Sequence, residues 1–280
     1  MTIFMIVIVL LGWIFGASQG IGYGGIAIAV VIAMIMNLIG YFKGDKIALA
    51  MSKAQPIKKE NNPYVYRLVE NLCISSGLPM PKVHLIPDQN INAFACGRKP
   101  ETASIAISEG AIAKLANEEL EGVIAHELSH IKNYDIRVMT IVIICVGVVT
   151  LMADFFLRAQ FFFGGRRDSR EGGNIGAILM IVGLVLAILS PVFAMLIQLA
   201  VSRKREYLAD ASGALLTRYP EGLARALEKI KNSNQPSKTA NHATAHLYIA
   251  NPFEGVGKKV AGWFSTHPPL GDRIARLRKM

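Results

Sequence analysis

The chain has 280 residues, of which 52% are hydrophobic and 18% charged, and its mean hydropathy of +0.38 excludes a wholly soluble protein. Its net charge of +10 would suit a nucleic-acid partner. The sequence has no aromatic-studded basic motif, so we expect no nucleic acid and expect the basic residues to face anionic lipid. Three cysteines without CxxC spacing argue against a disulfide framework or a cysteine zinc site, and they fit a reducing compartment.

Four apolar segments divide the chain. The first two are separated by a short turn of small residues and predict an uncleaved N-terminal transmembrane hairpin over 1–42. A signal peptide is the alternative for the first segment, but this segment lacks the basic residues with which a signal peptide starts. The last two predict a second hydrophobic hairpin over 138–202. The segments are 3–17, 25–42, 138–157 and 175–201.

The basic residues between these segments predict the orientation. There are 12 Lys and Arg from 43 to 137 and 14 from 203 to 279, but none in the loop 18–24. The positive-inside tendency therefore places both large polar segments in the cytoplasm and the first loop outside. Four arginines between 158 and 170 resist this pattern, so whether the second hairpin spans the bilayer fully stays open.

The polar segment 43–137 predicts mixed α and β structure. A helix is expected over 62–76, and another after Asn117, which suits an N-cap and is followed by two glutamates. Short runs of apolar and β-branched residues, separated by turn-rich pieces, predict strands. The expected strands are 83–88, 91–96 and 104–108.

The second of these helices contains the motif His-Glu-Leu-Ser-His at 126–130. Residues four apart lie one turn above each other, so His126 and His130 can bind one metal ion. Glu127 lies beside them, where it can act as the general base toward a water molecule. The motif predicts one zinc ion per chain, because zinc polarises a scissile carbonyl and acidifies water.

A third zinc ligand has to come from elsewhere in the chain. Glu206, just after the fourth apolar segment, is the best candidate, and Asp210 on the same helical face could hold one zinc histidine from outside the coordination shell. His242 and His246 are also four apart, but they lie in a segment with Pro236 and small residues that predicts a loop. Ligands to one ion share one side of the membrane, which fits a hairpin between them.

The combined motifs resemble the HtpX family of bacterial membrane proteases, which are relatives of the CAAX prenyl endopeptidases. The resemblance covers essentially the whole chain and rests on four motifs in this order: Asn92-Ala-Phe-Ala, the pentad at 126–130, Glu206-Tyr-Leu-Ala-Asp210, and the stretch from His267 to Arg273.

Several roles are implied by this resemblance. It implies zinc on His126, His130 and Glu206, with Glu127 as the base. It implies that His267 helps to stabilise the oxyanion, and that Arg273 supports Glu206 or the site near it. It also implies an edge strand that pairs with an extended substrate, formed by Asn92, Ala93, Phe94 and Ala95.

We therefore expect a multi-pass α-helical membrane protein with a cytoplasmic α+β zincin (HExxH) metalloprotease domain, built from 43–137 and 203–280. The resemblance implies a bacterial inner-membrane endopeptidase that degrades misfolded or damaged membrane proteins under stress, with membrane lipids and quality-control proteases as partners. The alternatives are a processing protease for specific membrane-bound substrates and a non-catalytic zinc-binding scaffold. An intact Glu127 argues against the scaffold. Cleavage within the bilayer is disfavoured by the charged residues around the pentad.

Overall fold

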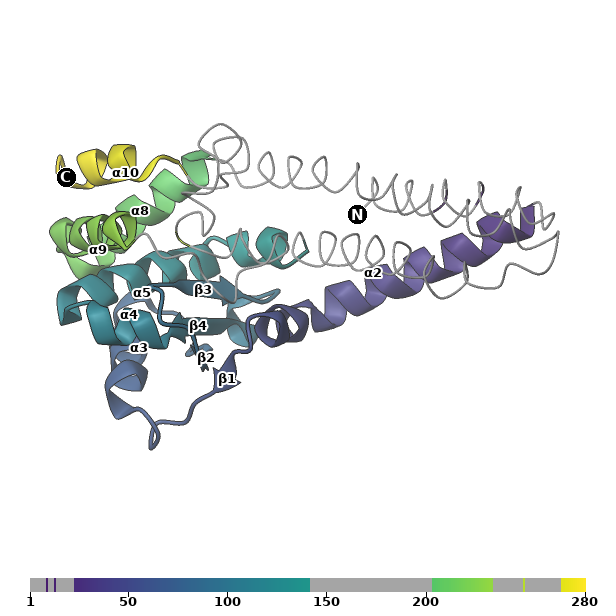
Figure 1. The fold of residues 1–280 in the computed structure, drawn as a ribbon, viewed down its shortest axis with the longest axis horizontal. Coiled ribbons are helices and arrows are strands. Elements are labelled where there is room, and N and C mark those ends of the chain that lie inside the picture. Colours follow the sequence, from purple (N-terminus) through teal and green to yellow (C-terminus); the bar gives the residue numbers. More distant parts are fainter. Residues whose placement is uncertain (1–8, 10–12, 14–22, 142–202, 234–248, 250–267) are drawn as a thin grey trace, which may run out of the picture. The chain divides into compact units, whose positions relative to one another are not determined.

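The computed structural model describes residues 9, 13, 23–141, 203–233, 249 and 268–280 (Figure 1). The chain divides into two compact units, the first made of Met1–Lys43 and Ile144–Ala194 and the second of Gly44–Ile143 and Met195–Met280. The predicted apolar segments 3–17, 138–157 and 175–201 lie almost wholly outside the described residues. The second unit contains the sheet and the helices discussed below, except for the first of them, most of which belongs to the first unit.

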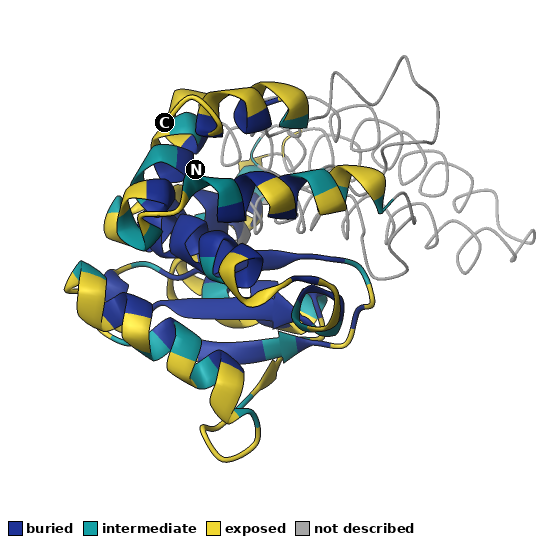
Figure 2. Ribbon diagram, turned by 90° about the vertical axis from the view of Figure 1, so that its left-hand side faces the viewer, coloured by how far each residue is buried: buried dark blue, intermediate teal, exposed yellow. Residues whose placement is uncertain are grey.

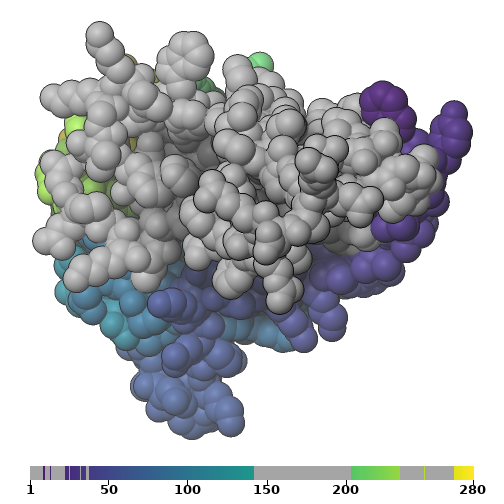
Figure 3. Space-filling view, turned by 45° about the vertical axis from the view of Figure 1, so that its right-hand side comes forward, coloured from purple at the N-terminus to yellow at the C-terminus, as the bar shows by residue number. Residues whose placement is uncertain are grey.

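Helix α2 (Tyr23–Met51) contains the predicted apolar segment 25–42 and continues nine residues beyond it. Its outward side chains include Ile28, Val31 and Leu38, each more than half exposed, and the helix is purple in the space-filling view (Figure 3). Among the described residues, no single helix meets the length and apolarity needed to cross a bilayer. The pair Ile26–Ile35 and Leu38–Met51, bent by 46°, meets them only together.

The second unit is built around a four-stranded sheet in the order β1-β2-β4-β3. The central strands β2 (Lys82–Ile86) and β4 (Ser104–Ser108) are parallel, and β3 (Ala93–Cys96) pairs antiparallel with β4 at one edge. These three strands confirm the sequence prediction to within two residues at each end. The two-residue strand β1 (Gln55–Pro56), antiparallel to β2, was not predicted.

Helix α3 (Pro63–Ser76) confirms the predicted helix and begins and ends as its sequence dictates. The Asn62 side chain accepts a hydrogen bond from the Val65 N–H, and the C-cap residue Gly77 adopts φ 70°. A 3-10 turn (Pro100–Thr102) and the short helix α4 (Glu109–Lys114) flank β4.

Helix α5 (Asn117–Lys132) carries the pentad and forms the centre of this unit. It contacts β3 and α3, and α8 (Arg203–Thr217) and α9 (Pro220–Asn232) also pack against it. Nearly every residue from Glu119 to Ile131 is buried (Figure 2, dark blue). Because α3, α8, α9 and β3 all pack against α5, its polar side chains are buried together with its apolar ones.

The beginning of α5 differs from the prediction by one residue. The N-cap is Ala116, whose N–H donates to the Glu119 carboxylate at 2.8 Å, and Asn117 is the first helical residue. The Asn117 side chain instead accepts a hydrogen bond from the Tyr64 hydroxyl at 3.1 Å. The glutamate three residues into the helix supplies the cap that Asn117 was expected to provide.

The last described helix, α10 (Leu270–Leu277), begins directly after Pro269 and packs against α8 and α9. Its buried face consists of Arg273, Ile274 and Leu277. A fully buried arginine is exceptional in a protein core, and its position is explained by the site described next.

Candidate metal centre

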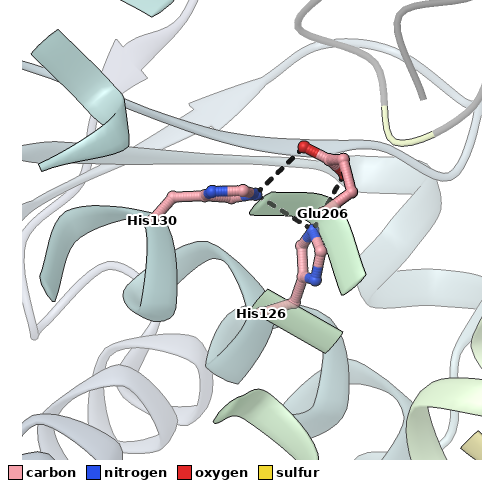
Figure 4. A group of neighbouring side chains, drawn as sticks. All are labelled: His126, His130 and Glu206. Atoms are coloured by element: carbon pink, nitrogen blue, oxygen red, sulfur yellow. Dashed lines mark hydrogen bonds and ion pairs between the residues drawn. The ribbon is translucent and has the colours of Figure 1, made fainter. Parts of the chain in front are cut away.

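Helix α5 presents two imidazole rings to one point. His126 and His130 lie one turn apart, and their Nε2 atoms are 3.2 Å apart (Figure 4). Both side chains are almost completely buried, at 2% exposure. Two buried imidazoles whose Nε2 atoms point toward one position can both bind the same metal ion, as the two histidines of this motif are expected to do.

Helix α8 brings Glu206 to the same point (Figure 4). One of its carboxylate oxygens lies 3.8 Å from Nε2 of His126 and the other 3.5 Å from Nε2 of His130. The Glu206 side chain is fully buried. The packing of α8 against α5 therefore completes a His-His-Glu set from residues far apart in the sequence.

The spacing of these atoms fits a zinc ion. Zinc binds histidine nitrogen and carboxylate oxygen at about 2.0–2.2 Å, so two ligands of a tetrahedral site lie roughly 3.3–3.6 Å apart. The two Nε2 atoms are 3.2 Å apart, and each lies 3.5 or 3.8 Å from one of the two Glu206 carboxylate oxygens, which is close to this range. Three protein ligands also leave the fourth position for water or substrate, as a catalytic site needs.

Asp210 lies against the far side of His126. Its Oδ1 atom is 3.0 Å from Nδ1 of that ring, so the imidazole is held with Nε2 toward the metal position. The sequence had placed Asp210 beside one of the two histidines, and the structure identifies His126. Asp210 follows Glu206 by one helical turn, so both acidic side chains reach α5 from the same face of α8.

Arg273 of α10 binds Asp210 through both of its carboxylate oxygens. Its Nε and Nη2 atoms donate to Asp210 at 2.8 and 2.7 Å, and Nη2 lies 3.5 Å from Nε2 of His126. Burial would raise the pKa of Asp210, but the positive charge of Arg273 and the hydrogen bonds from His126 and Arg273 hold that pKa well below its usual range. The resemblance implied that Arg273 supports Glu206 or the site near it, and in the structure Arg273 binds Asp210, one helical turn after Glu206.

His130 has a corresponding carboxylate that the sequence analysis did not single out. Oδ2 of Asp135 lies 3.0 Å from its Nδ1. Burial would lower the pKa of His130, but the hydrogen bond to Asp135 and the charges of Glu206 and Glu127 raise it to about 9 in the metal-free protein. Sequence spacing could not find Asp135, because it lies five residues after His130 and beyond the end of α5.

Glu127 is buried, and it lies next to this cluster on α5. Its negative charge contributes to raising the pKa of His130 and of Arg273, which places the carboxylate within electrostatic reach of both. A buried carboxylate beside two metal-ligand candidates is suited to accept a proton from a water molecule in the site.

The charges also fit a divalent cation. The described residues of the site include four carboxylates and two guanidiniums. Histidines bind a metal in their neutral form, so with both rings neutral the site has two negative charges for a metal ion to balance. The carboxylates are Glu127, Asp135, Glu206 and Asp210, and the guanidiniums are Arg205 and Arg273.

The predicted substrate strand lies at the sheet edge that α5 contacts. Ala93, Phe94 and Ala95 belong to β3, the outermost strand beside β4. Asn92 lies just before β3; its N–H donates to the Ser108 hydroxyl, and its side-chain oxygen accepts from the Ile249 N–H at 3.3 Å. The Asn92 amide therefore holds the chain at Ile249, a contact that sequence reasoning missed.

Three histidines considered in the sequence lie outside the described residues. They are His242, His246 and His267, so their roles stay predictions.

The chain is similar to known peptidases. Residues 59–280 match peptidase family M48. A "Protease HtpX homolog" of Syntrophobacter fumaroxidans is 48% identical over 273 residues, covering 96% of this chain and 93% of the relative. Another, from Caldanaerobacter subterraneus, is 42% identical over 280 residues, covering all of this chain and 92% of the relative.

A solved structure shares the fold. The crystal structure of Ste24p from S. mikatae matches with a TM-score of 0.51 at 19% identity, over 89% of this chain. The matched part spans 57% of the length of that protein.

Proposed function

The chain belongs to peptidase family M48 and is a membrane-associated metalloprotease, and from that premise we propose that it is a zinc-dependent endopeptidase using His126, His130 and Glu206 as ligands. The observation that carries the proposal is the buried convergence of these three side chains at separations that suit tetrahedral zinc, with Glu127 beside them.

The residues of the chain have distinct tasks in peptide hydrolysis. A bound zinc ion supplies Lewis acidity toward the scissile carbonyl and toward water. Glu127 accepts a proton from the attacking water and delivers it to the departing amine. Asp210 holds His126, and Arg273 keeps Asp210 ionised. His267 is proposed, from the family resemblance alone, to help stabilise the oxyanion.

Substrate recognition is proposed at the edge strand. An extended peptide can pair with the backbone of β3, a form of binding that tolerates many side chains. The edge position of β3 and its contact with α5 support this role for Ala93, Phe94 and Ala95. Asn92 would then act indirectly, by fixing Ile249 beside the strand.

The charge pattern and the relatives of the chain suggest its location and its substrates. We propose that the protein spans an inner (cytoplasmic) membrane with its site on the cytoplasmic face and degrades misfolded or damaged membrane proteins, in contact with lipids and quality-control partners. The positive-inside charge pattern and the HtpX relatives support this. A processing protease for specific membrane-bound substrates is the alternative, and the buried Glu127 favours either enzyme over a scaffold.

Two variants test the chemistry. Glu127→Gln should retain zinc but lose nearly all cleavage of a casein-type substrate, because the ligands are untouched. Glu206→Ala should lose both, whereas the double change His242→Ala and His246→Ala should leave the zinc stoichiometry at one. Metal analysis decides the ligand set: loss of zinc only in the double histidine variant would overturn it.

Reporter fusions test the orientation. A fusion after Gly20 should report an external position, and fusions near Lys58 and at the C-terminus should report the cytoplasm. A fusion near Arg167 shows whether the second hairpin crosses. A cytoplasmic signal from Gly20 would overturn the proposed compartment of the site.

A further inference from the structure

We propose that Asp135 and Arg205 form a positioning pair for the metal ligand His130, and that this pair tunes the affinity of the site for zinc. The inference rests on the proposed zinc site and adds two residues that no motif of the sequence assigned to it. Neither residue is a proposed ligand or the proposed base.

The chain bends sharply to bring Asp135 back onto His130. Helix α5 ends at Lys132, Tyr134 adopts a left-handed conformation with φ 61°, and a further helical stretch runs from 135 to 141. A bulky residue rarely takes positive φ, so the surrounding contacts must hold this turn in place. Its result is a buried Asp135 carboxylate 3.0 Å from Nδ1 of His130.

Arg205 of α8 holds the other oxygen of this carboxylate. Its Nε and Nη2 atoms bind Oδ1 of Asp135, and Nη2 also donates to the Asn133 carbonyl oxygen at 3.1 Å. The guanidinium thus binds both the carbonyl of Asn133, the C-cap residue of α5, and the carboxylate of Asp135 beyond it. Because Arg205 directly precedes Glu206, the contact also fastens the third ligand's helix to the end of the helix that carries the other two.

The two histidines therefore have matching supports. His126 is held by Asp210 and Arg273, and His130 by Asp135 and Arg205. Both carboxylates are buried, but the arginines differ: the Arg273 side chain is fully buried, whereas that of Arg205 is 50% exposed.

The physical consequence is a fixed tautomer. A carboxylate that accepts from Nδ1–H leaves the Nε2 lone pair free for the metal and prevents the ring from turning. Removing such a support typically weakens metal binding by about 10- to 100-fold. Arg205 acts through Asp135 and is partly exposed, so its removal should have a smaller effect, about two- to fivefold.

The test is zinc binding by the full-length protein in detergent, measured by competition with a chromophoric chelator. Asp135→Asn should weaken zinc binding by about 10- to 100-fold. Arg205→Gln should weaken it by about two- to fivefold. Arg203→Gln is the matched control: it removes the same charge from an exposed position two residues earlier on α8 and should leave affinity unchanged. The double variant of Asp135 and Arg205 should bind no more weakly than Asp135→Asn alone.

Cobalt substitution separates positioning from a purely structural role. The visible spectrum of the cobalt-loaded protein should change in Asp135→Asn, because the geometry around the metal depends on the ring of His130. A structural role alone would lower the thermal unfolding midpoint of the metal-free protein and leave affinity and spectrum as in the wild type.

The outcomes distinguish this inference from the proposed function. A wild-type protein that binds no zinc contradicts the proposed function. A wild type that binds zinc, with Asp135→Asn binding it equally well, overturns only the positioning pair. If Asp135→Asn does not fold, Arg205→Gln decides: equal affinity to Arg203→Gln overturns the pair, and weaker binding supports it.

Discussion

Gly213 sets the distance between α8 and the helix that carries the zinc-ligand candidates. A Cβ atom at this position would lie 3.0 Å from the backbone N of His126, 3.2 Å from its Cα and 3.3 Å from the Ala125 carbonyl carbon. Ordinary contacts of a Cβ atom begin at 3.4 Å. Because these neighbours are backbone atoms inside a buried helix, Gly213→Ala must push the two helices apart by about 0.4 Å or more.

The displacement reaches the site directly. Asp210 lies one turn before Gly213, and the 3.0 Å contact between its Oδ1 atom and Nδ1 of His126 would lengthen to about 3.4 Å. A misplacement of 1 Å can cost about 100-fold in rate, so 0.4–0.5 Å should cost on the order of tenfold. Overpacking costs about 1–3 kcal/mol, offset by up to about 1 kcal/mol from the better helix propensity of alanine.

The assay compares Gly213→Ala with Gly271→Ala, whose added Cβ would meet no atom of the described part of the chain within 4 Å. We expect Gly213→Ala to cleave a casein-type substrate about tenfold more slowly at saturating zinc and to unfold at a lower temperature. Gly271→Ala should cleave normally and gain about 0.5–1 kcal/mol in the free energy of unfolding. A Gly213→Ala protein that is as active as the wild type and as stable as the control would refute the reasoning.

Three further predictions follow from buried or capped groups. Arg273→Met should lower the free energy of unfolding of the metal-free protein by about 3–5 kcal/mol, because it leaves the Asp210 carboxylate buried without its partner. A loss of less than about 1 kcal/mol, measured by chemical unfolding, would contradict the pairing. Asn62→Ala should cost about 0.5–2 kcal/mol in the same measurement, since the Val65 N–H loses its cap, and no change would show that the cap is dispensable. Burial raises the pKa of Cys73 to about 11, so only about 0.1% of this thiol is ionised at pH 8. The rate of its alkylation should therefore rise roughly tenfold per pH unit up to about pH 11. Peptide mapping that shows Cys73 labelled at pH 8 as fast as a free cysteine would contradict the raised pKa.

The parts of the protein that local geometry controls could be predicted from its sequence. A helix repeats every 3.6 residues, so the pentad alone places His126 and His130 on one turn, and the same spacing puts Glu206 and Asp210 on one face. The three main strands also follow from short apolar runs between turn residues. The position of Glu206 just after the fourth apolar segment made it the best candidate for the third ligand, and the resemblance to HtpX proteases, which the comparisons confirm, implied the same role.

The partners of those residues were decided only by the tertiary structure. Which histidine Asp210 contacts depends on how α8 crosses α5, and that crossing depends on a glycine at 213 that carries no sequence signal of its own. The support of His130 by Asp135 requires a left-handed residue at Tyr134, a conformation that a tyrosine does not predict. Contacts between residues separated by many turns depend on helix packing, which no local periodicity records. The sequence could therefore predict Asp210 as a support without showing which histidine it contacts, and it could not predict Asp135 or Arg205.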